Sequence, residues 1–413
     1  MKQILEGIRI LDLTRVLAGP WCAQNLADLG ADVIKVERPG AGDDTRTWGP
    51  PFLKDRAGHD TTDAAYYLAA NRGKKSVTID LACAAGQQAV RELALQCDVL
   101  LENYKVGQLK KYGLDYDSLR TANPRLIYCS ITGFGQTGPW AHRPGYDFLI
   151  QGVGGLMSVT GEADDRPGGG PQKVGVAVAD LFAGMYTTVA ILAALRHRDA
   201  TGLGQVIDMA LLDTQVAMLA NLGANYLVTK KAPRRAGNAH PNIVPYQVFE
   251  VADGHLILAI GNDGQFQRFC AVAGCAEVAG DTRFARNADR VRHRDALVPM
   301  LVPVLLTRTR AQWLSTLEAA TVPCGPINDF DDVFADPQVK ARGMVARVPH
   351  PHSDALDLVA SPLKLSRTPV RSATAPPLLG EHTDEVLAGF GFDATERQRL
   401  RDAGVFGASA VKK

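Results

Sequence analysis

The sequence has no excess of charge of either sign and no cysteine or histidine pattern that would hold a metal. Its 413 residues carry 45 basic and 44 acidic side chains, so the formal net charge is +1. Such a chain has no overall field that would attract nucleic acid or an anionic membrane, and we expect neither as a partner. The seven cysteines form no CxxC pair and the nine histidines form no HxxxH or HExxH pair. We therefore expect reduced thiols, a cytoplasmic protein and no metal site.

A secretion signal and a dinucleotide-binding fingerprint are also missing. The first apolar run, 7–13, is broken by two charged residues and does not resemble a signal peptide. A strand at 7–13, a helix at 22–30 and a strand at 31–37 would be typical of dinucleotide-binding folds, and Glu37 stands where an acidic residue would bind a ribose. The loop after the first strand has no GxGxxG. We therefore do not expect a nicotinamide or flavin enzyme.

Strand and helix patterns alternate through the first 140 residues. Apolar strands are expected at 7–13, 31–37, 76–81, 97–103 and 126–135, with helices at 22–30 and 84–96. Strands separated by helices of this length pair in parallel, which predicts an α/β fold with a doubly wound sheet.

The pattern changes near the middle of the chain. A long helix, a basic linker and a small α+β unit with two strands are expected in turn, at 205–228, 230–242, 246–253 and 255–260. Amphipathic helices are expected near the end, at 380–391 and 394–404. We predict a large domain built from residues 1–224 and 326–413, and a small domain with linkers at 225–325.

One carboxylate stands alone in the most apolar segment. Between Lys173 and Arg196 the only charged residue is Asp180. Burying a carboxylate among apolar side chains is costly, so such a residue caps a helix, pairs with a distant cation or reacts. The segment is long enough to span a bilayer, but its glycines, threonines and tyrosine favour a buried helix that begins near Asp180. At a helix N-terminus the carboxylate would stay ionised at neutral pH, as a nucleophile requires.

Basic residues recur after the early strands, where the loops of an open α/β sheet border a ligand crevice. They are Arg15, Arg38, Arg46, Arg72, Lys74, Lys75 and Lys111. Such a set suits a ligand with several phosphates.

Short motifs along nearly the whole chain occur in the order and spacing of one enzyme family. They include RVLAGP at 15–20, LGADVIKVER at 29–38, NRGKKS at 71–76, LENY at 101–104, NPR at 123–125, SITGFGQTGP at 130–139, GLGQVID at 202–208, GNAHP at 237–241 and LGEHTD at 379–384. By these motifs the sequence resembles the family III CoA-transferases, the group of formyl-CoA and carnitine CoA-transferases. It looks nearest to the branch that uses succinyl-CoA and dicarboxylate acceptors. The resemblance implies coenzyme A as a substrate, a Rossmann-like large domain from both termini, a smaller α+β domain, and an interlocked homodimer.

The family's nucleophile is an aspartate that opens an apolar helix, and Asp180 matches it. The resemblance implies ping-pong catalysis, in which Asp180 forms a mixed anhydride and then an aspartyl-CoA thioester. Backbone N–H groups of Leu17 and Ala18 would bind the oxyanions. Formyl-CoA transferase has Gln at the position of Leu17, which argues against formyl or oxalyl transfer.

The predicted CoA-binding set combines family contacts with the basic residues above. It comprises Arg15, Arg38, Arg72, Lys74, Lys75, Ile79, Asp80, Asn103, Tyr104, Lys105, Lys111, Tyr146 and Asp147. Ala82 replaces a Lys of formyl-CoA transferase, and we expect Lys74 or Lys75 to compensate.

Three residues are predicted near the acyl group. The loop that holds His240 reaches the active site in the family, so His240 is either a substrate contact or a satisfied loop histidine. Gly261 and Asn262 match a glycine-rich loop that closes over the acyl intermediate in formyl-CoA transferase.

Two alternatives differ in chemistry. The α-methylacyl-CoA racemases of the same family use a His from a Gly-His-Asp segment, and here Tyr146 replaces that His, which disfavours racemisation. Asp147 of the same segment either orients the acceptor or a water, or caps the helix that follows. The other alternative is a CoA-binding homologue without turnover, which the retention of Asp180 disfavours.

Overall fold

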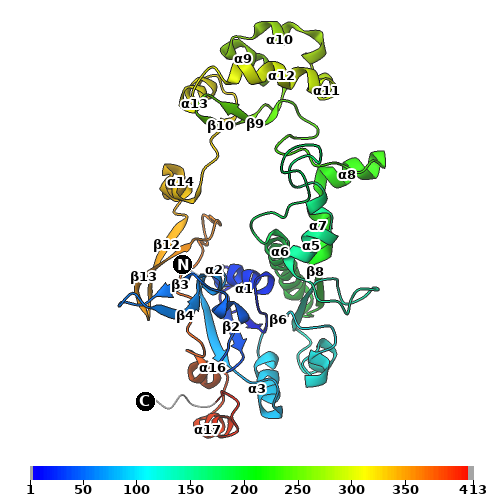
Figure 1. Ribbon diagram of the computed structural model, residues 1–413. Helices are drawn as coiled ribbons and strands as arrows, with labels where there is room; N and C mark the ends of the chain where they lie inside the picture. The colour runs from blue at the N-terminus through cyan, green and yellow to red at the C-terminus, as the bar shows by residue number, and fades with distance from the viewer. Residues whose placement is uncertain (1–2, 408–413) are drawn as a thin grey trace. The chain divides into compact units, whose positions relative to one another are not determined.

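A six-stranded parallel sheet lies at the centre of the larger of two units into which the chain divides (Figure 1). The computed structural model describes residues 3–407. The strands run in the order β5 (Lys74–Thr78), β2 (Asp32–Glu37), β1 (Arg9–Asp12), β6 (Val99–Glu102), β7 (Ile127–Thr132) and β8 (Val206–Ala210), and every neighbouring pair is parallel. Counted along the chain this is the 3-2-1-4-5-6 order of a Rossmann fold, as predicted. The strand order reverses between β1 and β6, where a ligand crevice is expected.

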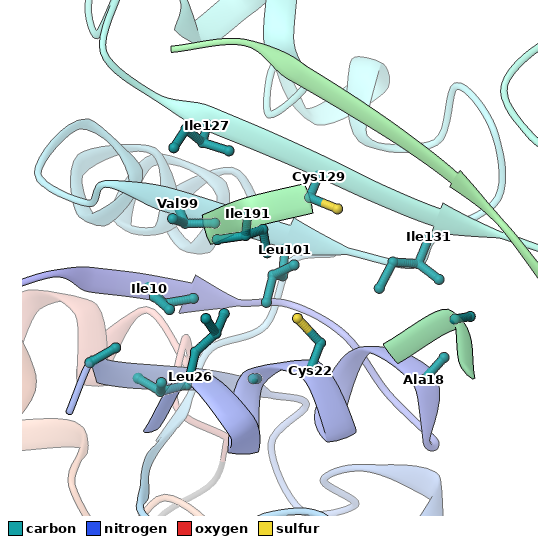
Figure 2. Packing of buried hydrophobic residues seen from close by; sticks show 14 of the residues in the cluster. Ile10, Ala18, Cys22, Leu26, Val99, Leu101, Ile127, Cys129, Ile131 and Ile191 are labelled. Carbon is teal, nitrogen blue, oxygen red and sulfur yellow. The ribbon is translucent and has the colours of Figure 1, made fainter. Parts of the chain in front are cut away.

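Both faces of this sheet are covered, and accordingly nearly every residue of β1, β2, β6 and β7 is buried. Successive side chains point to opposite faces, so Ile10 joins one core and Leu11 the other. On the first face, helices α1 (Ala18–Asp28) and α6 (Val178–Thr201) pack against the strands, and Figure 2 shows Cys22, Leu26 and Ile191 meeting Leu101 there. The second face is covered by α3 (Ala84–Leu95), α16 (Thr383–Gly389) and α17 (Ala394–Asp402).

Within the described residues, the first unit comprises 3–155, Val174–Ala224 and 340–407. Its smaller elements are two antiparallel hairpins and several short helices. They are β3 (Phe52–Lys54) with β4 (Asp60–Ala64), β12 (Val345–His350) with β13 (Ser353–Val359), α2 (Ala65–Ala69), α4 (Tyr116–Leu119), α5 (Asp147–Val153), α7 (Leu211–Met218) and the 3₁₀ turns Asp44–Thr47 and Leu109–Tyr112.

The second unit comprises Leu156–Lys173 and Asn225–Val339, with its own core around Phe266 and Trp313. A three-stranded antiparallel sheet, β9 (Tyr246–Val251), β10 (Gly254–Ala259) and β11 (Cys324–Gly325), matches the two predicted strands and adds a third. Its helices are α9 (Asp263–Ala273), α10 (Ala276–Gly280), α11 (Asn287–Arg292), α12 (Arg294–Leu305), α13 (Arg310–Ala319) and α14 (Phe330–Ala335). Helices α8 (Ala220–Thr229) and α15 (Pro337–Ala341) cross the boundaries between the units.

The long helix predicted at 205–228 is wrong at its start. Residues Val206–Ala210 form β8, which pairs with β7 so that Asp208 lies opposite Ser130. A short apolar run fits both helical and strand periodicity, and here pairing with the exposed edge of β7 satisfies its backbone groups. The helical pattern resumes as α7 and α8.

Helix α1 begins at Ala18, four residues before the predicted start. Pro20 is tolerated because N–H groups in the first turn of a helix have no partner within it. The residues expected to bind oxyanions therefore lie at a helix N-terminus.

Helix α6 begins at Val178, which places Asp180 in its first turn, as predicted. Among the described residues α6 is the one helix long and apolar enough to cross a membrane, and half of that apolar stretch is buried within the protein. The buried half packs on the sheet as expected of a core helix.

Candidate active site

The loops that follow β1 and β6 are tied together across the point where the strand order reverses. The side chain of Asn103, after β6, accepts a hydrogen bond from the Arg15 N–H at 3.0 Å and donates one to the Arg15 carbonyl at 2.7 Å. Asn103 was predicted to bind CoA; in the structure its amide makes this backbone clamp, and the residue also lines the pocket of Asp180. The clamp fixes the loop that leads into α1.

That loop contains a strained residue. Val16 has a φ of 73°, a conformation that a β-branched side chain rarely adopts and that the surroundings must enforce. Asp43 accepts a hydrogen bond from the Val16 N–H at 3.2 Å, and Lys35 donates one to the Thr14 carbonyl at 2.8 Å. The fully buried Lys35 and Asp43 form an ion pair of 2.8 Å. The backbone at Thr14 and at Val16 is thus held by the two members of one buried ion pair.

Helices α1 and α6 approach closely at the site because α6 has a glycine at 184. A Cβ placed on Gly184 would lie 2.7 Å from the Ala18 carbonyl oxygen and 3.1 Å from the Trp21 ring. Gly184 lies one helical turn after Asp180. The missing side chain therefore brings the first turn of α1 beside the first turn of α6.

Asp180 is 9% exposed, and its carboxylate makes no hydrogen bond or ion pair within residues 3–407. Burial, and secondly the charge of Asp147, raise its pKa from 3.8 to about 7. At neutral pH the group is therefore partly ionised, less than expected for a carboxylate at a helix N-terminus, because desolvation and a neighbouring carboxylate disfavour the charged form. A buried, unpaired carboxyl group that titrates near neutrality is typical of a reactive residue.

Asp147 caps the helix that carries Asp180. Its Oδ1 accepts a hydrogen bond from the Ala179 N–H at 2.8 Å, and its Oδ2 accepts one from Gln151 Nε2 at 2.8 Å. Gln151 in turn accepts a hydrogen bond from the Val174 N–H at 2.9 Å. Asp147 is itself the first residue of α5, so it does not cap its own helix. The chain Asp147–Gln151–Val174 fixes the entry to α6.

Two adjoining pockets open at this end of the sheet. The first is lined by Asp180, by Leu17 and Ala18 at the start of α1, by Lys105 and by the loop that holds Arg143 and Tyr146. The second is lined by Arg38 and by the segment from Ile79 to Ala82. Arg15, Tyr104 and Gln108 line both pockets, so these three residues form the passage between them.

Comparison with known proteins identifies the family to which the protein with these pockets belongs. A sequence model described as CoA-transferase family III matches residues 5–383. The chain belongs to CoA-transferase family III. It is therefore an enzyme, a CoA-transferase, as the motifs indicated.

Two relatives and two solved structures show how close this membership is. The chain is 52% identical over 387 residues to succinate–glutarate CoA-transferase of Agrobacterium fabrum, covering 94% of this chain and 96% of that protein. It is 45% identical over 383 residues to succinyl-CoA:glutarate CoA-transferase of Mus musculus, covering 93% and 85%. A CAIB/BAIF family protein from Brucella suis superposes with a TM-score of 0.81 at 50% identity over 94% of this chain and 100% of that one. A hypothetical protein from Mycobacterium tuberculosis gives 0.77 at 30% identity over 93% and 99%.

Five of the residues predicted to bind CoA line neither of the two pockets, and one of them is Asp147, which caps α6. Arg72 is buried and holds Asp28 through hydrogen bonds of 3.0 and 2.5 Å. Lys74 is buried and lies 3.1 Å from Asp12, and burial lowers its pKa to about 8. Lys75 pairs with Asp32 and Glu385. Lys111 lies in the turn Leu109–Tyr112. Arg72, Lys74 and Lys75 are used in internal ion pairs, and the geometry gives no support to the idea that Lys74 or Lys75 compensates for Ala82.

The three residues predicted near the acyl group all belong to the second unit. The ring of His240 lies 5.2 Å from that of Tyr246, and its Nδ1 accepts the Asn242 N–H at 3.1 Å. Asn262 caps α9, and the Gly261 N–H donates to Gln265 at 2.7 Å. Each of the three has a structural partner within its own unit, and their contact with substrate stays a prediction.

Two residues near Asp180, Tyr66 and Arg143, carry no signal in the sequence. Tyr66 and Trp48 stack edge to face at 5.2 Å, and burial and the charges of Asp180 and Asp147 raise the pKa of Tyr66 to about 12. Its hydroxyl therefore stays protonated near the nucleophile. Arg143 was also missed, although it lies in the same segment as Tyr146 and Asp147. No local pattern marks these residues, because the fold alone brings them to Asp180.

Proposed function

We propose that this enzyme transfers CoA from succinyl-CoA to a small dicarboxylate such as glutarate, through covalent intermediates on Asp180. The observation that carries the proposal is the Asp180 carboxylate, which is buried, unpaired within the described residues and close to ionisation at neutral pH. A carboxylate held for structure would instead be paired, as Asp43 is with Lys35. The named activities of the relatives support the choice of donor and acceptor.

The first half-reaction forms a thioester on the enzyme. The ionised Asp180 attacks the succinyl-CoA carbonyl carbon, and the CoA thiolate leaves, giving a mixed anhydride. The thiolate then attacks the Asp180 carbonyl of that anhydride and releases succinate, which leaves an aspartyl-CoA thioester. In the second half-reaction the acceptor carboxylate displaces the thiolate to form a new anhydride. The thiolate attacks the acceptor's carbonyl, and the new acyl-CoA leaves with Asp180 restored as carboxylate.

Each attack creates an oxyanion that needs hydrogen-bond donors. The N–H groups of Leu17 and Ala18 line the same pocket as Asp180 and have no acceptor within residues 3–407. They begin α1, so the positive end of the helix dipole adds to their effect. The hydrogen bonds of Asn103 to the Arg15 backbone and of the Val16 N–H to Asp43 preorganise these donors.

Different parts of the CoA molecule would occupy the two pockets. Its nucleotide would lie in the second pocket with Arg38, and its pantetheine arm would pass Arg15 and Tyr104 to reach Asp180 in the first. Arg15 reaches Asp44 at 2.9 Å and lies over the Tyr104 ring, so the passage is shaped by groups that CoA can displace.

A homodimer accounts for apolar side chains that the single chain leaves exposed. Phe182, Met185, Tyr186 and Val189 on α6 are each more than two fifths exposed, as are Phe148 and Leu149 on α5. A cluster of this kind marks an interaction surface, and a second copy of the chain is the partner that the family resemblance implies. Sedimentation should give a dimer, and Val189→Glu with Met185→Glu should shift it toward monomer.

The transfer itself is tested by incubating enzyme and succinyl-CoA with short mono- and dicarboxylates and separating the CoA esters. Glutaryl-CoA and succinate should form in equal amounts with glutarate. Asp180→Ala should abolish turnover while calorimetry still detects CoA binding. Full activity in that variant would contradict the mechanism.

Racemisation makes a different prediction. Tyr146, where the racemases have a His, is 63% exposed. We expect no deuterium at the α-carbon of a 2-methylacyl-CoA incubated with the enzyme in D₂O.

A further inference from the structure

One cation in the first pocket is held in place by aromatic rings and not by a carboxylate. The guanidinium of Arg143 lies 4.8 Å from the centre of the Trp140 ring and 5.5 Å from that of Phe134. Those two rings meet edge to face at 5.5 Å, and Phe134 is buried. Within residues 3–407 Arg143 forms no ion pair. A guanidinium on an aromatic face keeps its donors available to an anion.

The loop that carries Arg143 is anchored beside the nucleophile. A Cβ placed on Gly133, just after β7, would lie 2.5 Å from the Cα of Gly145, so the loop crosses the end of that strand in direct backbone contact. Two residues further on, Asp147 bonds to the N–H that precedes Asp180. Arg143 thus stands on a fixed loop that begins and ends at the site.

Arg143 also lies on the acyl side of the site. It lines the pocket of Asp180 and does not line the second pocket, where Arg38 lies. Arg15 differs from it in both respects, because Arg15 lines both pockets and is paired with Asp44. The one arginine of the Asp180 pocket that is unpaired within the described residues is therefore placed where the acyl group, and not the CoA nucleotide, would lie.

We propose that Arg143 binds the far carboxylate of dicarboxylic acyl groups and so selects diacids over monoacids. This inference rests on the proposed function, in which one carboxylate reacts at Asp180 and the other needs a partner. Arginine matches a carboxylate through two parallel hydrogen bonds. Because donor and acceptor acyl groups use the same pocket in turn, Arg143 acts on both half-reactions. A monocarboxylic acid of equal length leaves the guanidinium without its anion.

The test compares acids that differ only at the far end. For wild type, Arg143→Ala, Arg143→Lys and the control Arg125→Ala, kcat/KM is measured with glutarate and with pentanoate as acceptors of CoA from succinyl-CoA. In ping-pong kinetics the acceptor's kcat/KM reports the second half-reaction alone. Arg125 is exposed at the other end of β7. Arg143→Ala should lower the preference for glutarate by about 10- to 100-fold, the range for a hydrogen bond to a charged group, and leave pentanoate unchanged. Arg143→Lys should keep part of the preference, and Arg125→Ala should keep all of it.

Three other outcomes are informative. If wild type and Arg143→Ala have the same preference for glutarate, the inference is wrong and the proposed function stands. If Arg143→Ala weakens succinyl-CoA and butanoyl-CoA equally as donors, Arg143 binds the CoA moiety and the inference is again wrong. If wild type transfers CoA to no acid, the proposed function itself fails.

Discussion

Replacing Asp147 by Asn should make the enzyme more active at acidic pH. The substitution removes one negative charge near Asp180 and keeps an oxygen that can accept the Ala179 N–H, now bonded at 2.8 Å. The new amide would face the Gln151 amide, which must rotate, at a cost of about 1 kcal/mol in stability. The start of α6 therefore stays capped while the charge next to the nucleophile disappears.

The size of the effect follows from the causes of the Asp180 pKa. Burial is the larger cause of its rise from 3.8 to about 7, and Asp147 is the smaller. Asp147 thus supplies less than half of the rise, and we take its share as about one pKa unit, or ~1.4 kcal/mol. The nucleophile is the ionised form, so the acid limb of the pH profile should move from about 7 in wild type to about 6 in the variant. At pH 6 the reactive fraction should rise about fivefold.

The assay is the pH dependence of kcat/KM for succinyl-CoA, which reports groups of the free enzyme. The control is Asp213→Asn, which removes an exposed carboxylate of α7 that is not among the causes of the Asp180 pKa. Its acid limb should stay at the wild-type position. An Asp147→Asn limb that stays in place or moves to higher pH would refute the electrostatic coupling of the two carboxylates.

Two further changes test the packing and the energetics of the site. Gly184→Ala places a methyl group 2.7 Å from the Ala18 carbonyl oxygen, so it should push α1 away from α6. We expect it to cost about 1–3 kcal/mol of stability and to lower kcat ~10- to 100-fold. The control Gly389→Ala, whose new methyl group meets no atom within 4 Å, should leave kcat unchanged. If Gly184→Ala and wild type have equal kcat values, this helix contact does not position the site. Asp180→Asn should abolish turnover and yet stabilise the fold, because a carboxyl group whose pKa is raised on folding makes stability fall as pH rises from about 4 to 7. The gain in the free energy of unfolding should be largest at pH 8, of order 2–4 kcal/mol, and absent near pH 4. A lower Tm than wild type at pH 8 would contradict the unpaired state of the carboxylate.

The sheet and the position of Asp180 could be predicted from local pattern because each depends on few residues. Apolar strands covered on both faces are continuous in the sequence, as at Val99–Glu102, and one charge in an apolar segment is visible at once. The strand β8 could not be recognised, because five mostly apolar residues carry no period that excludes a helix. The segment forms a strand because it pairs with the free edge of β7, and that edge exists only in the folded protein.

The roles of several residues at the site could not be predicted from the sequence for a similar reason. Arg72 and Lys74 look like ligand-binding cations in the sequence, and only the fold reveals that Asp28 and Asp12 already neutralise them. The raised pKa of Asp180 depends on Asp147, which lies 33 positions earlier in the chain and is brought near by the packing of α5 on α6. Pairings between distant segments decide which charges are free to bind a substrate.

The most direct test of the central claim is to trap the enzyme after mixing it with succinyl-CoA. Borohydride reduces an acylated or thioesterified aspartate to an alcohol and leaves a free carboxylate intact. After digestion, mass spectrometry should find that alcohol at Asp180 only in samples that received succinyl-CoA. If the peptide with Asp180 is unmodified while glutaryl-CoA still accumulates, covalent catalysis at this residue is contradicted.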